Sequence, residues 1–251
     1  MSQPKASEQA WASPTSDKIN DNDGGIFVYG LFDQEVTDQL GPGVCFGADE
    51  FQFRSEGAGR LGGILSNYHT RPPLGYARRI RVPDRVKPYG AELKDFYCRN
   101  FLRSIWIYAT CHTLPKAGNR VDVDPEVRDP RGVPVSRITY RQHPHNADVE
   151  RFMVDRCAGL LKEAGAIEVV KPTVVRESEA GISTHQLGSC RMGNDPASSV
   201  TDRTGRVHGV PNVYVADGSL LVNPGGSNPS LTLQALAYWV SAAIRKSHSV
   251  M

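Results

Sequence analysis

The sequence predicts a mixed α/β fold in which an antiparallel sheet with flanking helices is followed by one last strand and helix. Short apolar runs bounded by turn residues, typical of strands, recur along the first two thirds of the chain. Apolar residues spaced by three and four, typical of amphipathic helices, stand between them. With 251 residues, 39% of them hydrophobic and 22% charged, the chain has the composition of a folded globular protein.

Four segments carry the strand signal in this part of the chain. An apolar run from 26 to 32 lies between glycines and Asp33, and Phe51 and Phe53 alternate with polar neighbours. Two further strands, around 121–123 and 137–141, enclose a proline-rich stretch that we interpret as a long hairpin loop. Together they predict a mostly antiparallel sheet.

Two longer segments carry the helix signal. Residues 91–108 place apolar side chains three and four apart, which predicts one amphipathic helix whose face packs in the core. Asn146 offers an N-cap to a second helix, and Gly165 is placed to end it. A further strand is expected around Val174.

The composition divides the chain into three parts and does not favour nucleic acid or a membrane as a partner. Residues 1–24 form a polar lead-in, 25–178 the domain that holds the sheet, and 179–251 a C-terminal segment rich in Gly, Ser, Asn and His. The formal net charge of +2 favours neither nucleic acid nor an anionic membrane. No apolar run is long enough to span a bilayer and the polar start lacks a signal-peptide core, so a cytoplasmic location is the default and membrane insertion is not expected.

The charged and cysteine side chains have ordinary interpretations. The basic cluster at 78, 79, 81, 85 and 87 alternates with Ile80 and Val82, which predicts the solvated edge of a strand. Five scattered cysteines without a CxxC pair suit reduced thiols. The histidines at 112, 143 and 145 lack the spacing of a zinc site, and His143 and His145 are expected to alternate at a strand end, so no metal site is predicted.

Two motifs near the C-terminus are the most specific signal: a first motif, Ser183–Gly193 (STHQLGSCRMG), and a second motif, Asn212–Thr232 (NVYVADGSLLVNPGGSNPSLT). In the second motif, Val213–Val215 predict a short strand that runs into Asp217 and Gly218, where a ligand can approach the backbone closely.

The second motif then predicts a turn and a helix. Asn228 is a good N-cap, Pro229 suits the first helical position, and Ser230 follows at the start of a helix that runs to about residue 244. The free backbone N–H groups and the positive dipole end of that helix would stabilise negative charge on a ligand.

These two motifs resemble the C-terminal part of the glucose-methanol-choline (GMC) oxidoreductase family, with a weaker resemblance over residues 96–165. The resemblance implies FAD as the cofactor, and it implies that residues 25–178 form the substrate-binding domain and 179–251 the last strand and helix of the FAD-binding domain. By position His185 is the catalytic base and Asn228 its partner, a place that holds His in other members. Asp217, Gly218, Asn228, Pro229 and Ser230 would line the FAD.

The resemblance implies oxidation of the CH–OH group of an alcohol, sugar or polyol. A neutral histidine can accept a proton at physiological pH, so His185 could take the hydroxyl proton while a hydride passes to the flavin N5 atom. The Asn228 amide could orient the substrate. We interpret Arg191 as an anchor of its own loop, and Cys190 as a buried small residue, because no base is arranged beside it.

An alternative of a different class remains open. Family members are longer and begin with a glycine-rich βαβ unit that grips the ADP half of FAD. Gly57, Gly59 and Gly62 spell GxGxxG, but Gly63 and two prolines interrupt the helix that should follow, so we do not interpret them as that unit. The chain would then be a truncated or split half, inactive alone, whose partner is a separate FAD-binding half; an electron-transfer subunit is a second candidate partner.

Overall fold

The computed structural model describes residues 14–16, 26–36, 44, 46–53, 62–68, 72–141, 143–172, 186–223 and 225–248. The chain divides into two compact units. We call Gly24–His112 with Ala147–Val175 the sheet unit, and Met1–Asp23 with Thr113–Asn146 and Arg176–Met251 the C-terminal unit. The domain boundaries at residues 24 and 178 stay a prediction.

The sheet unit is built on a five-stranded sheet in which every neighbouring pair is antiparallel, as the sequence predicts. Its strands, in spatial order, are β3 (Gly47–Ala48), β4 (Gly63–Tyr68), β5 (Ser104–Cys111), β2 (Ile26–Leu31) and β8 (Glu168–Val170). The predicted strand at 26–32 is therefore confirmed as β2, whose six residues are all buried. The strand expected around Val174 lies outside the described residues.

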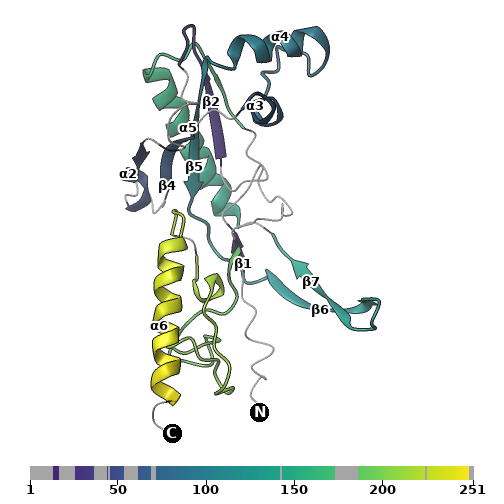
Figure 1. The fold of residues 1–251 in the computed structure, drawn as a ribbon, viewed down its shortest axis with the longest axis vertical. Coiled ribbons are helices and arrows are strands. Elements are labelled where there is room, and N and C mark those ends of the chain that lie inside the picture. The colour runs from purple at the N-terminus through teal and green to yellow at the C-terminus, as the bar shows by residue number, and fades with distance from the viewer. Residues whose placement is uncertain are drawn as a thin grey trace. The chain divides into compact units, whose positions relative to one another are not determined.

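Helix α5 (Pro144–Glu163) covers one face of this sheet from Ala147 onward, and Figure 1 shows it beside β4 and β5. The apolar spacing of this segment predicts a buried stripe, and Val149, Met153, Cys157 and Leu161 are at most 1% exposed and pack against the sheet. Leu160, which the same spacing places in the stripe, is 44% exposed, so that part of the prediction is wrong. Gly165 ends the segment as predicted: its φ is 91°, a conformation that favours glycine.

Aromatic side chains fill the opposite face. The Tyr29 and Trp106 rings meet edge to face, with centroids 4.7 Å apart, and Trp106 is fully buried. Tyr76 from α3 (Pro73–Arg79) and Phe96 from α4 (Gly90–Asn100) close this core. The two faces are thus both covered within the sheet unit.

The predicted helix over 91–108 is only half right. Helix α4 ends at Asn100, and β5 begins at Ser104 in the middle of the predicted helix. Its bulky residues Ile105, Trp106 and Ile107 form the centre of the sheet, where aromatic and β-branched side chains pack well. Pairing with β2 and β4 overrides the local helical pattern.

Three smaller expectations are also wrong. Phe51 lies in a helical turn, α2 (Glu50–Phe53), and not in a strand, because its ring packs edge to face on Phe152. Helix α5 begins at Pro144, so the Asn146 side chain does not cap it; instead its Oδ1 atom accepts the Leu114 N–H at 2.9 Å. His143 and His145 consequently flank the first residue of a helix and not a strand end.

The basic cluster is solvated as expected, but it is not a strand. Arg78 lies on α3 and Arg81 follows it in an irregular segment, both exposed. Ile80 is buried and ends the helix, since its N–H donates to the Tyr76 carbonyl. The Arg85 guanidinium forms an exposed ion pair with Glu168. The rejected GxGxxG ends at Gly62, which runs directly into strand β4 and not into a helix.

The C-terminal unit contains two small ribbons and two helical segments: β1 (Pro14–Ser16) paired with β9 (Gln186–Gly188), β6 (Arg120–Arg128) paired with β7 (Pro134–Thr139), the 3₁₀ turn η1 (Gly218–Leu220) and helix α6 (Ser230–His248). The predicted hairpin is confirmed, with longer strands and a shorter loop than expected. The Asp129 carboxylate closes that loop by accepting the N–H groups of Arg131 and Val133 at 2.8 and 2.9 Å.

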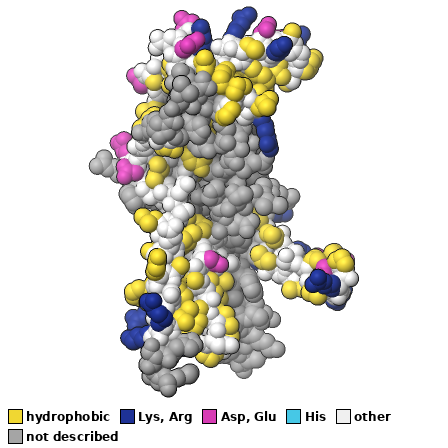
Figure 2. Space-filling model, viewed as in Figure 1, with side chains coloured by type: hydrophobic (Ala, Val, Ile, Leu, Met, Phe, Trp, Pro, Cys, Tyr) yellow, Lys and Arg dark blue, Asp and Glu magenta, His cyan; other side chains and the backbone are white. Residues whose placement is uncertain are grey.

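The β6–β7 hairpin has two unlike faces. Val121, Val123 and Ile138 share one face, and Val123 and Ile138 are 64% and 59% exposed. On the other face Asp122 pairs with Arg120 and Arg137; hydrogen bonds from Arg137 and then Arg120 lower the pKa of Asp122 to about 2. Figure 2 shows hydrophobic and basic side chains side by side on the hairpin.

The described residues of the second motif contain no regular strand, so the strand predicted at Val213–Val215 is wrong. Tyr214 forms an isolated antiparallel bridge with Arg206, and the described residues show no longer ladder at Val213–Val215. Helix α6 packs on the loop before it through the fully buried Val240. Among the described residues, no helix has both the length and the apolarity needed to cross a bilayer.

Gly205 and Gly209 offer a matched test of this packing. Both have positive φ, 78° and 77°, but a Cβ on Gly205 would lie 2.6 Å from the Val215 carbonyl oxygen and 2.7 Å from Val240, whereas nothing lies within 4 Å of one on Gly209. We expect Gly209→Ala to cost about 1 kcal/mol of unfolding free energy from backbone strain, and Gly205→Ala about 2–4 kcal/mol. Urea unfolding of both variants measures the difference, and equal losses would contradict this packing.

The cysteines differ in their predicted reactivity. Cys157 is fully buried, and desolvation raises the pKa of its thiol to about 12, whereas Cys98 is exposed. Because the thiolate is the reactive form, Cys157 should resist alkylation at pH 8 in the folded protein while Cys98 reacts. Mass spectrometry after iodoacetamide treatment measures this, with protein unfolded in urea as the control; labelling of both at equal rates would refute the assigned burial.

Candidate active site

The two motifs meet in the C-terminal unit through backbone hydrogen bonds. The Cys190 N–H of the first motif donates to the Ser219 carbonyl of the second at 2.8 Å, and the Met192 N–H donates to the Leu220 carbonyl at 3.4 Å. Strand β9 thereby lies against η1. Segments that are well separated along the chain, and that the sequence marked independently, are adjacent in space.

A sharp reversal precedes this contact. Gly188 and Ser189 both have φ of 84°, and Ser189 is the one described residue other than glycine with a positive φ. A serine in this region is uncommon and strained, by about 1–2 kcal/mol. Strain of this kind is often found at functional sites, so the observation directs attention to this turn.

Asp217 holds the second motif in place. Its carboxylate accepts the Ser219 N–H at 2.9 Å and the Ser219 hydroxyl, which caps η1 at Gly218. The same Ser219 presents its carbonyl to Cys190. Sequence reasoning missed Ser219, although an Asp two residues before a Ser is a common local capping pattern.

The turn before α6 is also fixed locally. The Asn223 side chain accepts the Gly225 N–H at 3.0 Å, and Gly225 and Gly226 have φ of 74° and 72°. Helix α6 begins at Ser230, and the Leu233 N–H donates to the Pro229 carbonyl at 2.9 Å, so Pro229 occupies the N-cap position. The helix therefore begins one residue later than predicted.

Asn228 consequently does not cap the helix. It is exposed, and its side chain makes no hydrogen bond to another described residue. His185 lies outside the described residues; strand β9 begins at the next residue, Gln186. No described contact joins Asn228 to β9 or η1, so the pairing of His185 with Asn228 stays a prediction.

Arg191 anchors its own loop, as predicted. Its Nε–H donates to the Ser198 carbonyl at 2.6 Å, and its carbonyl accepts the Val200 N–H at 3.1 Å. Cys190 is half-buried and not fully enclosed, and the Thr201 hydroxyl donates to its carbonyl at 3.3 Å. The chain after the first motif is thus folded back on itself.

His208 is a second histidine in this loop, with a structural role. Its Nε2 atom lies 3.0 Å from the Ser199 hydroxyl and 3.2 Å from the Gly193 carbonyl. Because a carbonyl oxygen can only accept a hydrogen bond, Nε2 carries the ring hydrogen and has no free lone pair. This contact explains His208 without assigning it to the chemistry.

A cavity of about 300 Å³ opens beside the joined motifs. The first motif contributes Gly188, Ser189 and Arg191, the second contributes Leu221 and Val222, and the segment before the hairpin contributes Pro115 and Ala117. We call it the motif cavity. Its walls are apolar side chains and backbone, and among its described lining residues Arg191 alone is charged. Pro115 and Ala117 carry no local signal that sequence reasoning could have used.

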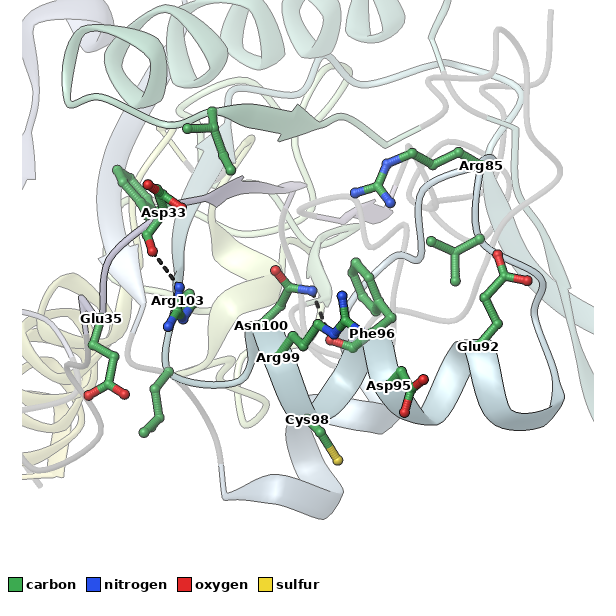
Figure 3. A pocket seen from close by; sticks show the side chains of 14 residues that line it. Asp33, Glu35, Arg85, Glu92, Asp95, Phe96, Cys98, Arg99, Asn100 and Arg103 are labelled. Carbon is green, nitrogen blue, oxygen red and sulfur yellow. Dashed lines mark hydrogen bonds between the residues drawn. The ribbon is translucent and has the colours of Figure 1, made fainter.

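A larger cavity, of about 740 Å³, lies in the sheet unit and has a different character. Figure 3 shows Glu92, Asp95, Cys98 and Arg99 on α4 along its rim, and Arg103 hydrogen-bonded to the Asp33 carbonyl. Acidic and basic side chains alternate around it. Because neither motif contributes to its lining, the motif cavity is the better candidate for the active site.

Comparisons with known proteins bear on the same segment. Residues 115–237 match the family model described as GMC oxidoreductase. A 6'''-hydroxyparomomycin C oxidase from Streptomyces lividus is 43% identical over 133 residues, which are 52% of this chain and 23% of that protein. The gluconate 2-dehydrogenase flavoprotein of Pantoea cypripedii is 25% identical over 233 residues, which are 87% of this chain and 37% of that protein.

Among solved structures, pyridoxine 4-oxidase from Mesorbium loti superimposes on 95% of this chain with a TM-score of 0.51 and 14% identity, and the match covers 44% of that enzyme. This likeness supports the fold. The chain thus spans less than half the length of the proteins it matches. GMC oxidoreductases are in general FAD-dependent enzymes acting on alcohols and sugars. The matched family model and the relatives place residues 115–237 of this chain in the GMC oxidoreductase family.

Proposed function

We propose that this chain forms part of an FAD-dependent oxidoreductase that oxidises the CH–OH group of an alcohol, sugar or polyol, with His185 as the base and Asn228 as its partner. The observation that carries the proposal is the Cys190–Ser219 hydrogen bond, which joins the two motifs beside an apolar cavity. Two relatives named above, an oxidase and a dehydrogenase flavoprotein, are oxidoreductases by name and support the reaction class.

The residues present suit one part of FAD. A planar flavin ring needs flat apolar walls and backbone that it can approach closely, which Leu221, Val222 and the Gly188–Ser189 turn provide. The exposed start of α6 offers backbone N–H groups near Asn228, Pro229 and Ser230 to the negative edge of a reduced ring. Asp217 and Gly218 would meet the cofactor through backbone, because the Asp217 carboxylate is already engaged by Ser219.

His185 would remove the hydroxyl proton of the substrate. A neutral imidazole accepts one proton at one ring nitrogen, and the electron pair left on oxygen drives a hydride away from carbon. FAD, when bound, supplies the acceptor for that hydride.

Asn228 would orient the substrate without competing for the proton. Its amide can donate to the hydroxyl oxygen but cannot act as a base at neutral pH. Since its side chain makes no hydrogen bond among the described residues, no internal bond to them must break before it binds substrate. Its position before α6 adds the positive end of the helix dipole to the developing alkoxide.

The rest of the FAD contacts would come from outside this chain's described residues. Helix α6 carries a row of exposed apolar side chains on one face, Leu231, Ala235, Tyr238 and Ala242, with Leu231 and Tyr238 80% and 79% exposed. Figure 2 shows hydrophobic side chains along this helix. Such a face suits packing against an FAD-binding half, whether on the same polypeptide or on a separate chain.

Flavin reduction tests the proposal. The visible spectrum of the purified protein with FAD should lose its flavin bands when a sugar or alcohol substrate is added. His185→Ala should slow this bleaching by about 10²- to 10⁴-fold, because the general base is lost. Unchanged FAD uptake by the variant is the control. Bleaching of the variant at the parent rate would refute the assignment of His185.

Asn228 is tested by two substitutions at one position. Asn228→Ala should slow bleaching by about tenfold or more, whereas Asn228→His should retain most of the rate, since histidine also donates a hydrogen bond and occupies this place in other family members. Because Asn228 does not cap α6, the free energy of unfolding of both variants should stay within about 0.5 kcal/mol of the parent value. Equal rates for Asn, Ala and His would exclude a role in substrate positioning.

A further inference from the structure

We propose that a cavity at the C-terminal end of α6 binds the phosphate group of a small organic phosphate. The cavity has a volume of about 460 Å³, and we call it the α6-end cavity. It is separate from the motif cavity, with which it shares no described lining residue, and the proposed oxidation makes no use of it. The inference therefore goes beyond the proposed function. The described residues that line it all belong to the C-terminal unit: Asn194, Asp202, Arg203, Thr204, Arg206, Tyr214, Ala243, Lys246 and Ser247.

Positive charge predominates in the lining of this cavity. Arg203, Arg206 and Lys246 are cations, and Asp202 is the one acidic residue among the described lining residues. The Asp202 carboxylate is already engaged, because it accepts the Thr204 N–H at 2.8 Å and lies 3.4 Å from Nε of Arg206. Two positive charges are left without a carboxylate partner among the described residues. A phosphate monoester carries about −1.5 to −2 charges at pH 7, which matches this excess.

Hydrogen bonds join the segments that form the cavity. The Arg203 carbonyl accepts the indole N–H of Trp239, on α6, at 2.9 Å. The Tyr214 hydroxyl donates to the Ser247 hydroxyl, also on α6, at 3.4 Å, and Tyr214 forms the backbone bridge with Arg206. The turn that carries two of the cations is therefore tied to the helix that carries the third. Such a preformed arrangement reduces the entropy that is lost when several donors bind one ligand.

The dipole of α6 explains only part of this cluster. Lys246 lies in the last turn of the helix, where a cation offsets the negative end of the dipole, and so does Arg245, which does not line the cavity. Arg203 and Arg206 come from a different segment, so the dipole gives no reason for their place beside Lys246. A phosphate group gives such a reason, because guanidinium groups bind its oxygens through paired hydrogen bonds.

The size of the cavity favours an organic phosphate over a bare ion. A volume of about 460 Å³ lies in the range of cavities that hold small organic molecules. Tyr214 and Ala243 are partly buried and add aromatic and apolar surface to the lining. A compound that joins an aromatic ring to one phosphate group is therefore suited to both parts of the lining.

Phenyl phosphate and benzenesulfonate test this assignment, because they share a ring and differ in the charged group. Neither contains an alcohol, so neither is a substrate of the proposed oxidation. Near pH 7.5 the first carries about two negative charges and the second carries one. We expect isothermal titration calorimetry of the purified protein to show phenyl phosphate binding about tenfold more tightly. Equal affinity for the two probes would overturn the proposal.

Three single substitutions locate the bound phosphate. Arg203→Gln and Lys246→Gln should each weaken phenyl phosphate binding by about tenfold, because each removes one cation from the lining. Both residues are exposed and their side chains make no hydrogen bond to a described residue, so both variants should keep the melting temperature of the parent. Arg245→Gln removes the same charge outside the lining and should leave the affinity within about twofold of the parent value. Equal weakening by all three would indicate attraction to general positive charge and would also overturn the proposal.

A titration in the presence of FAD separates this site from the cofactor. The proposed FAD contact at Ser230 and the cation of Lys246 lie at opposite ends of α6, whose 19 residues span about 28 Å. Phenyl phosphate should therefore bind equally well with and without FAD. Loss of its binding when FAD is added would assign the cavity to the cofactor diphosphate and overturn a separate site. Absence of flavin bleaching, with phenyl phosphate binding as expected, would count against the oxidoreductase proposal alone.

Discussion

The site depends on one backbone hydrogen bond, from Cys190 to the carbonyl of Ser219. On one side of it, the left-handed pair Gly188 and Ser189 turns the chain toward the second motif. On the other side, Asp217 holds Ser219 by its amide and hydroxyl. Because Leu221 and Val222 follow directly after η1, this bond also sets which side chains form the wall of the motif cavity. The strain at Ser189 is tolerated because both neighbouring segments are fixed.

Side chains around this bond have more than one task. Arg191 closes the loop to Ser198 through its Nε–H and is also among the residues that line the motif cavity. The Cys190 N–H donates to the Ser219 carbonyl, and the Cys190 carbonyl accepts the Thr201 hydroxyl, so the peptide groups on both sides of this residue are fixed. Such shared duties explain why a segment rich in glycine and serine, with little apolar surface of its own, can keep a defined shape.

The fold could be predicted from the sequence where the local pattern and the final packing agree. The stripe of Val149, Met153 and Cys157 has helical spacing and faces the sheet, so it was found. Residues 104–108 fit a helix and a strand equally well, and the partners that decided in favour of β5, such as Tyr29, are distant in the sequence. Asn146 is a good cap in isolation, but its buried amide is used by Leu114.

The residues of the candidate site also fall into two groups: those that a local sequence pattern reveals and those that only the tertiary fold reveals. The motifs marked Asp217, Asn228 and Arg191 because glycines, capping residues and charges leave local signatures. Pro115 and Ala117 enter the cavity wall only through tertiary folding, and the positive φ of Ser189 is not encoded in its residue type. Helix α6 begins at Ser230, one residue later than the capping pattern predicts, a difference that is usual for helix ends.

The position of β2 in its sheet has a consequence for how the protein is made. Tyr29 pairs with Trp106 on one side and with Val170 on the other, so the most buried strand is synthesised first among its partners and obtains its last neighbour only when β8 has left the ribosome. Until then a strand with an entirely apolar sequence has an open edge. Between the synthesis of β2 and that of β8, the nascent chain therefore exposes the unpaired edge of an apolar strand.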